Sequence, residues 1–265
     1  MTTLTPLRPS RAQSRTAPRT AALYAASLLA GLAIWQLLAW IYGPALLASP
    51  VDTARAFGEL AADGTLLNSV IASSRRILIG WALGLLVGVV VGLLMGRLRV
   101  VRVLLEPYIE FFRFVPPIAF VTLAIVWLGI GEASKVVLIF YTSVFIVALN
   151  TIAGVLAIDE AKLRAAASLG AGRLQVLRFV VFPAVVPHIV TAARLAMGNS
   201  FLTIVSAEIV ASQVGLGALI WTSRNYGRID WVFVGIVTLG LLGFVYDRIL
   251  RIVAGRVLRR YGVKM

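Results

Sequence analysis

Six stretches of this chain are apolar for long enough to cross a lipid bilayer as helices. Five of them contain no charged side chain, and one is interrupted only by Arg194 and Glu208. A helix needs about 20 predominantly apolar residues to span the hydrocarbon core. The stretches lie at 21–43, 77–96, 114–131, 136–158, 179–209 and 231–246. We therefore predict an all-α membrane protein with about six transmembrane helices.

The composition excludes a water-soluble protein. Of the 265 residues, 60% are apolar and 14% are charged, and the mean hydropathy is +0.94. The chain has no cysteine and a single histidine, His188, which excludes disulfides, thiolate zinc sites and histidine metal clusters. We expect no metal ion, and we interpret His188 as a structural residue rather than a proton relay or a ligand.

The net charge of +14 would by itself fit a nucleic-acid-binding protein. The cations, however, form short clusters between apolar stretches instead of one basic face interleaved with aromatic side chains. With both termini in the cytoplasm, the inner segments carry roughly three times as many cations as the outer ones, which satisfies the positive-inside rule. We therefore expect no nucleic-acid partner and predict that both termini are cytoplasmic.

The first 20 residues are rich in Thr, Ser, Arg and Pro and contain no acidic residue. Organelle transit peptides and the basic region of secretory signals share this composition. The apolar stretch that follows is much longer than the 7 to 15 residues or so of a signal-peptide core. We predict a disordered basic cytoplasmic tail at 1–20, a retained first transmembrane helix at 21–43, and a core at 44–265 with the other five.

Glycine recurs at every fourth position of the second apolar stretch, at Gly80, Gly84, Gly88, Gly92 and Gly96. Residues four apart share one face of a helix, so another backbone can approach this face closely. One interpretation is tight packing within a single subunit, and the other is a surface that slides during a transport cycle. Both interpretations require a bundle of helices and exclude a β-barrel.

The third apolar stretch contains two consecutive prolines, Pro116 and Pro117, and we expect its helix to begin near Val103. A proline leaves a backbone carbonyl without its usual amide donor. At membrane depth this is tolerated where the carbonyl faces a polar cavity or is bound by a neighbouring helix. Glu110 and Arg113 precede the prolines at helical spacing and can form an ion pair. The pattern indicates either a hinge on a translocation path or a kinked helix with an interfacial ion pair.

Three polar side chains in the fifth apolar stretch, Arg194, Asn199 and Glu208, are candidates for the translocation path. Ionisable groups within a membrane are energetically costly, which makes a functional role the first hypothesis. The alternative for Glu208, near the outer end, is that it reaches water or pairs with Arg224 or Arg228. The alternative for Arg194 is that its side chain extends to the inner interface.

The inner segment 159–178, between the fourth and fifth apolar stretches, is longer than a simple connector. Asp159 can cap a helix that has Glu160 in its first turn, and Gly170 can end this helix in the left-handed conformation. The predicted apolar face of the helix consists of Leu163, Ala166, Ala167 and Leu169. We predict a helical hairpin that either docks on another protein or rests on the membrane surface.

This segment resembles the signature loop of the inner-membrane permease subunits of ATP-binding-cassette (ABC) importers. That signature has Glu-Ala-Ala, a glycine a few residues later, and Ile-x-Leu-Pro after nine more. The matching residues here are Arg164, Ala165, Ala166, Gly170 and the run from Val180 to Pro183. Arg164 replaces the usual glutamate, which alters one salt bridge to the ATPase but keeps the spacing. The stretches SPVDTARAF, FFRFVPPIAFVTLAIVWLGIGEASK and SAEIVASQVGLGALI resemble the sulfonate, taurine and nitrate branch of the family.

The resemblance implies the type I ABC importer permease fold in a bacterial inner membrane, surrounded by lipid. It implies that the permease forms a homodimer with a second copy of itself. It also implies two cytoplasmic ABC ATPase subunits and an extracytoplasmic solute-binding protein that docks near Lys135 and 213–230. The permease itself would have no catalytic residue and no cofactor, since ATP and magnesium bind to the ATPase. The chain contains no Gly-Lys dipeptide, and hence no P-loop, which agrees with that division of labour.

The resemblance also divides the candidate residues into two groups. The predicted ATPase-coupling residues are Asp159, Glu160, Leu163, Arg164, Ala165, Ala166, Leu169, Gly170 and Pro183. The predicted translocation-path residues are Glu110, Arg113, Pro116, Pro117, Arg194, Asn199 and Glu208. ATP-driven closure of the two ATPases would move the paired hairpins and switch the bundles between inward and outward openings.

Two other function classes compete with this one. A secondary transporter driven by an ion gradient would use Glu208, Arg194 or the pair of Glu110 and Arg113 as coupling groups, and it would need no ATPase. A membrane-embedded enzyme would need two carboxylates or a serine and a histidine close together, whereas the single histidine is surrounded by apolar residues. The substrate does not follow from the fold.

Overall fold

A computed structural model of the chain describes residues 17–260. Of the predicted basic tail, residues 1–16 lie outside the described residues. Residues 17–20 belong to the first helix, α1 (Ala17–Tyr42), which therefore begins four residues before the predicted boundary. Within the described residues every regular element is a helix, as the sequence predicted.

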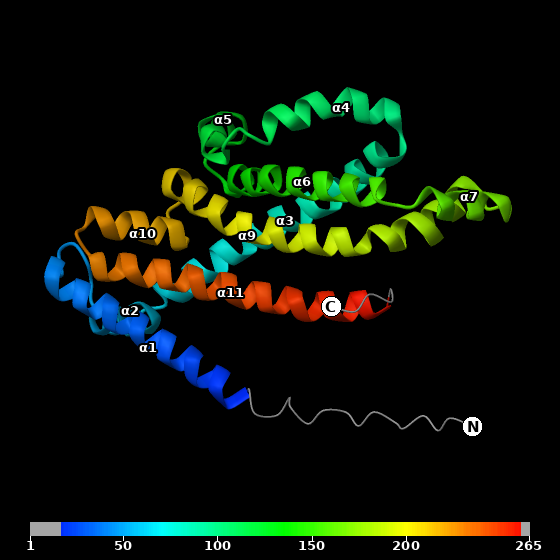
Figure 1. Cartoon of the computed structure of the whole chain (residues 1–265). Coiled ribbons are helices and arrows are strands. Elements are labelled where there is room, and N and C mark those ends of the chain that lie inside the picture. The colour runs from blue at the N-terminus through cyan, green and yellow to red at the C-terminus, as the bar shows by residue number, and fades with distance from the viewer. Residues whose placement is uncertain (1–16, 261–265) are drawn as a thin grey trace, which may run out of the picture.

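The helices differ strongly in length, and the long ones run side by side (Figure 1). After α1 the order is α2 (Pro50–Ala62), α3 (Thr65–Arg97), α4 (Arg99–Phe112), η1 (Pro117–Phe120), α5 (Val121–Leu128), α6 (Glu132–Leu156), α7 (Glu160–Ser168), α8 (Arg173–Val176), the π-helical segment η2 (Leu177–Val181), α9 (Phe182–Ala211), α10 (Leu216–Asn225) and α11 (Ile229–Arg260). Their surface exposes many large apolar side chains, among them Leu28, Leu86 and Phe244, which suits contact with lipid.

Five helical segments are long and apolar enough to cross a membrane, and a bent pair of helices that passes the same test together brings the number to six if the pair is counted as one span. This pair is α4 followed by η1 and α5, and its two halves are bent by 94°. The expectation of about six spans is confirmed, but the third span is not one helix from Val103. Its first half begins at Arg99, and Pro116 and Pro117 mark the break because they cannot continue an α-helix.

The glycine face of α3 packs directly against α6. A Cβ atom built on Gly84 would lie 2.4 Å from Cβ of Ser143, and one on Gly92 would lie 2.5 Å from Cβ of Thr151. Gly80, Gly88 and Gly96 meet α6 in the same way. The two backbones therefore approach more closely than any larger residue would permit, which is the predicted tight packing within one subunit.

The fifth span is longer than its apolar stretch suggests, because α8, η2 and α9 form one continuous rod from Arg173 to Ala211. Its π-helical segment ends where the amide of Phe182 bonds to the carbonyl of Leu177. Pro183 follows at the start of α9 and has no amide hydrogen to donate, so the helical bonding changes register here.

The two ends of the bundle carry different elements (Figure 1). The start of α1, the end of α11 and the short helix α7 lie at one end, and α2 and α10 lie at the other. We call these the α7 end and the α10 end. Since the α7 end carries the segment that the sequence predicts to be cytoplasmic, the arrangement is the one expected for two termini on the same side.

Candidate functional site

The predicted coupling segment forms a capped helix at the α7 end. The side chain of Asp159 accepts a hydrogen bond from the amide of Ala161 at 2.8 Å, as an N-cap does. At the other end, Gly170 has φ of 75°, and the amides of Gly170 and Ala171 bond to the carbonyls of Ala167 and Ala166. This is a Schellman motif, so both ends of the helix form as the sequence predicted.

The sides of α7 differ from the prediction of one continuous apolar face. Leu163 and Ala166 pack on a buried cluster of Val155, Val176, Val181 and Val185. Leu169, in contrast, is 88% exposed, and Ala167 is exposed as well. Leu163 and Ala166 therefore fix α7 to the bundle, and Leu169 points away from it.

The other predicted coupling residues occupy the open surface or the joint with α9. Arg164 and Glu160 form an exposed ion pair with 3.3 Å between the guanidinium and the carboxylate. Ala165 is exposed beside them, and Pro183 is half-buried in the first turn of α9. The exposed side of α7 is thus free, within the described residues, to contact another protein.

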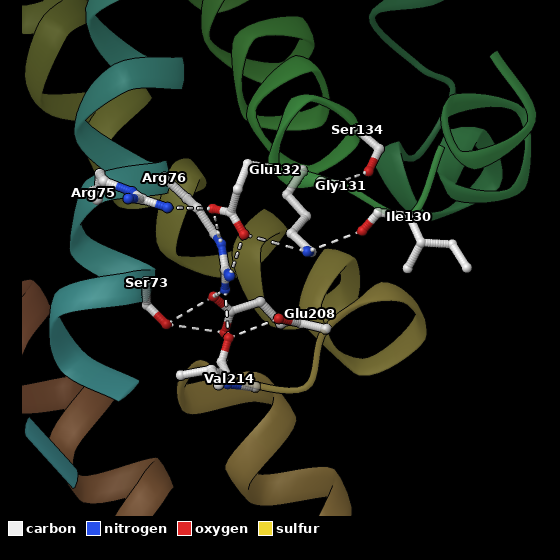
Figure 2. A network of polar contacts seen from close by, with 12 residues as sticks. Ser73, Arg75, Arg76, Ile130, Gly131, Glu132, Ser134, Glu208 and Val214 are labelled. Atoms are coloured by element: carbon white, nitrogen blue, oxygen red, sulfur yellow. Dashed lines mark hydrogen bonds and ion pairs between the residues drawn. The ribbon is translucent and has the colours of Figure 1, made fainter. Parts of the chain in front are cut away.

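A buried network of charged and polar side chains ties three helices together near the α10 end (Figure 2). Arg76 of α3 is 4% exposed, and its Nη1 atom donates to Glu208 of α9 at 2.6 Å. Its Nε and Nη2 atoms donate to the carboxylate of Glu132 of α6 at 2.8 and 2.6 Å. This bidentate geometry makes a strong and directional contact. The network therefore fixes α3, α6 and α9 relative to one another.

The same network holds the beginning of α10. The hydroxyl of Ser73 donates to Glu208 and accepts from the amide of Leu216 at 2.9 Å. The amide of Gly217 donates to the second carboxylate oxygen of Glu208 at 2.8 Å. Glu208 and Ser73 thus satisfy two of the amides that the first turn of a helix leaves without partners. Gly215 has no room for a side chain, because a Cβ atom there would lie 2.4 Å from the Glu208 carboxylate.

The two alternative environments given for Glu208, contact with water and pairing with Arg224 or Arg228, are wrong. Glu208 is fully buried, so it does not reach water, and its ion-pair partner is Arg76 rather than Arg224 or Arg228. Arg224 lies over the ring of Trp221, and Arg228 pairs with Asp230 and Glu59. The missed signal is the cation pair Arg75 and Arg76, which directly precedes the second apolar stretch and is part of the same helix.

Lys135 also lies elsewhere than expected. It was predicted to be at the outer docking surface, but it is 4% exposed. Its Nζ atom donates to the carbonyl of Ile130 at 3.3 Å and lies 3.6 Å from Glu132. Lys135 therefore belongs to the buried network and is not a surface cation.

The second predicted outer segment, 213–230, does reach the surface. Tyr226 is strongly exposed at the end of α10. Arg228 donates to Asp230 at 2.7 Å and to Glu59 of α2 at 3.0 Å, and these hydrogen bonds, that to Asp230 above all, raise the pKa of Arg228 above its ordinary value. The segment is therefore held in place by ion pairs, and Val214, Trp221 and Tyr226 are its exposed large apolar side chains.

Four of the predicted translocation-path residues surround one cavity at the break between α4 and α5. The cavity has a volume of about 340 Å³ and is lined by Arg113, Pro116, Pro117 and Asn199, together with residues of α6. Tyr141 of α6 donates from its hydroxyl to the carbonyls of Phe112 and Val115. The carbonyls freed by the break are therefore bound by a neighbouring helix.

The remaining path candidates, Glu110, Arg194 and Glu208, do not line this cavity. Glu110 pairs with Arg113 at 2.7 Å, as predicted from their spacing. Arg194 pairs with Asp247 of α11 at 3.0 Å and does not line the cavity. Glu208 belongs to the buried network described above. Among the described residues no group of three His, Asp or Glu side chains could hold a metal ion.

Comparisons with known proteins agree with this geometry. Residues 84–259 match the family model of the binding-protein-dependent transport system inner membrane component. A probable ABC transporter permease protein of Brucella melitensis is 38% identical over 85% of this chain and 91% of its own length. The taurine transport system permease protein TauC of Escherichia coli is 36% identical over 76% and 73% of the two chains. A putative aliphatic sulfonates transport permease protein, SsuC of Escherichia coli, is 35% identical over 82% and 83%.

Solved structures give the same fold. The MetNI methionine ABC transporter, solved in inward facing conformations, contains a chain that matches with a TM-score of 0.60 at 19% identity, over 73% of this chain and 98% of its own. The similarity to the taurine and sulfonate permeases confirms the resemblance to the sulfonate, taurine and nitrate branch, and an ion-gradient-driven secondary transporter is not favoured. The chain belongs to the family of binding-protein-dependent transport system inner membrane components, the permease subunits of ABC importers.

Proposed function

We propose that this permease carries small oxyanions, with taurine and other sulfonates as the first candidates and nitrate as a further one. The observation that carries the proposal is the similarity to the taurine permease across most of the chain. The cavity at the α4–α5 break adds chemical support, because Arg113 is its one charged lining residue among the described residues. A guanidinium forms hydrogen bonds with oxyanions in a planar, directional geometry.

The energy source in this proposal is a separate ATPase that binds α7. Support comes from the shape of α7, which projects at one end of the bundle and keeps Arg164, Ala165 and Leu169 exposed. The packing of Leu163 and Ala166 on the buried valine cluster would transmit a movement of α7 to α9. ATP and magnesium would bind to two ATPase subunits, and this chain would hold no cofactor.

The assembly we propose is a homodimer of this chain in a bacterial inner membrane. The α7 end and both termini would face the cytoplasm, and an extracytoplasmic binding protein would deliver the solute to the α10 end. The excess of cations in the segments at the α7 end supports this orientation. The exposed outer segment around Tyr226 is the proposed contact for the binding protein.

The test is taurine uptake into vesicles that contain this permease and its ATPase, with ATP in the lumen and a taurine-binding protein outside. Uptake should require ATP on the ATPase side, and Leu169→Asp should reduce it strongly together with ATPase co-purification. Leu169 is almost fully exposed, so the substitution leaves the fold intact. Leu46→Asp, at an exposed leucine near the opposite end, is the matched control and should leave both unchanged.

Three results would contradict the proposal, in whole or in part. ATPase recovery that is equal for Leu169→Asp, the control and the unchanged chain would exclude α7 as the docking element. Uptake driven by an ion gradient without any ATPase would favour the hypothesis of a secondary transporter. A binding protein that holds a neutral solute in place of a sulfonate would refute the substrate class alone.

A further inference from the structure

A second cavity lies at the α7 end, between the end of α3 and the rod formed by α8 and η2. Its volume is about 470 Å³, within the range of small-molecule sites. Its lining consists of four leucines and two arginines: Leu93, Leu94, Leu98, Leu177, Arg97 and Arg173. The cavity thus combines an apolar wall with two cations from segments that are far apart in the sequence.

Neither cation is neutralised within the described part of the protein. No carboxylate of the described residues lies within ion-pair distance of Arg97 or Arg173, and neither guanidinium forms a hydrogen bond to another described residue. The nearby Arg102 differs, since it donates to the carbonyls of Met95 and Gly96 at the end of α3. Arg102 therefore satisfies a helix end, and the two cavity arginines lack an anionic partner among the described residues.

The cavity lies at the boundary between the apolar and polar parts of the bundle. Gly96, one residue before Arg97, packs against Val155 of α6, and α6 ends at Leu156. Arg173 lies one turn before Leu177 and follows α7, the segment that leaves the bundle. Leu93 and Leu177 both pack against the buried valine cluster, on the inner side of the two arginines. The two cations thus lie where we expect the membrane interface, and Leu93, Leu94 and Leu177 lie on the apolar side of them.

We infer that this cavity binds an anionic phospholipid of the leaflet on the α7 side, with the phosphate held between Arg97 and Arg173 and an acyl chain against the leucines. The inference rests on the proposed function only in taking this leaflet as the cytoplasmic one. Phosphate with paired arginines forms charge-assisted hydrogen bonds, and basic pockets between spans at this depth suit such headgroups. The lipid would join α3 to α8 directly after the coupling segment.

The experiment uses the purified permease alone, without ATPase, binding protein or substrate, so that its outcome does not depend on transport. Its thermal stability in detergent micelles is titrated with phosphatidylglycerol and, separately, with phosphatidylcholine. Phosphatidylglycerol should stabilise the protein with saturation, and phosphatidylcholine should not. Equal stabilisation by both lipids would show that only the leucines matter and would overturn the inference.

The variant Arg97→Gln with Arg173→Gln should weaken the apparent affinity for phosphatidylglycerol about 30- to 100-fold, since two charge-assisted contacts are lost. The matched control is Arg99→Gln with Arg178→Gln, which removes the same charge at the same end from arginines outside the cavity. It should weaken the affinity less than about fivefold, because it changes only screened surface attraction. Equal losses in the two double variants would overturn the inference.

Two further arms distinguish a lipid from a simple anion. The variant Arg97→Lys with Arg173→Lys keeps both charges and should keep most of the phosphatidylglycerol effect, whereas a loss as large as with glutamine would contradict a phosphate contact. Inorganic phosphate at millimolar concentration should not stabilise the protein. Stabilisation by phosphate equal to that by the lipid would overturn the lipid assignment in favour of an anion site.

Discussion

Replacing Glu208 by alanine tests whether the buried network holds the bundle together at the α10 end. The substitution removes the carboxylate that accepts from Arg76 at 2.6 Å, from Ser73 at 2.8 Å and from the amide of Gly217 at 2.8 Å. Breaking a buried ion pair by removing one partner costs about 3 to 5 kcal/mol. Arg76 retains Glu132 and the carbonyl of Val214, so we expect the lower end, about 3 kcal/mol.

This loss shifts the folding equilibrium toward the unfolded protein by about 100-fold, because each 1.4 kcal/mol or so changes an equilibrium constant tenfold. Thermal unfolding in detergent measures it, and hydrogen exchange should show the first turn of α10 losing protection. The matched control is Glu110→Ala, since Glu110 also pairs with an arginine, at 2.7 Å, but at the exposed surface. The control should cost no more than about 1 kcal/mol. Equal melting temperatures for the two variants would refute the stabilising role of the network.

Three substitutions elsewhere in the bundle test single contacts, each with a control. Gly84→Ala puts a methyl group 2.4 Å from Cβ of Ser143, and thermal unfolding should show a loss of about 1 to 3 kcal/mol of stability. Its control, Gly198→Ala, meets nothing within 4 Å and should leave the stability unchanged or raise it in the same assay. Tyr141→Phe removes the side-chain donor of the Val115 carbonyl, while the Phe112 carbonyl keeps the amide of Val115, and it should lower both stability and taurine uptake. The exposed Tyr108→Phe should change neither, and unchanged uptake in both variants would exclude a role for the break. Arg194→Gln breaks only a partly exposed ion pair with Asp247 and should lower the free energy of unfolding by less than about 1 kcal/mol. A complete loss of uptake at normal stability would therefore support a role of Arg194 in the translocation path.

The sequence predicts those parts of the fold that depend on residues close together in the chain. The capping of α7 by Asp159 and its end at Gly170 require only a carboxylate and a glycine at the right spacing. The close face of α3 follows from the fourfold spacing of glycines such as Gly84. The break at Pro116 follows from the missing amide, but its angle of 94° depends on packing and does not.

Contacts between distant residues could not be predicted in this way. Arg76 and Glu208 are separated by 132 positions, and the alternatives Arg224 and Arg228 are closer to Glu208 in the sequence. The charge pattern also misled, because it counts Arg76 and Lys135 as cations outside the membrane. Both lie on helices that extend beyond the apolar stretches, and their side chains turn inward to a partner instead of outward to water.

The distribution of strong contacts indicates where the bundle can change shape during transport. The α3–α6 pair is joined by close backbone packing along its length and by the network of Arg76, Glu132 and Glu208 at one end, so it should move as a rigid body. At the α4–α5 break, in contrast, the side-chain hydrogen bonds to the carbonyls come from one tyrosine, and the adjoining ion pair is exposed. The π-helical segment that precedes α9 is a second place with irregular bonding. In the ATPase-driven cycle that we propose, a movement that begins at α7 would reach this segment first, through the packing of Leu163 on the cluster that contains Val181. We therefore expect the bending to occur there and at the break.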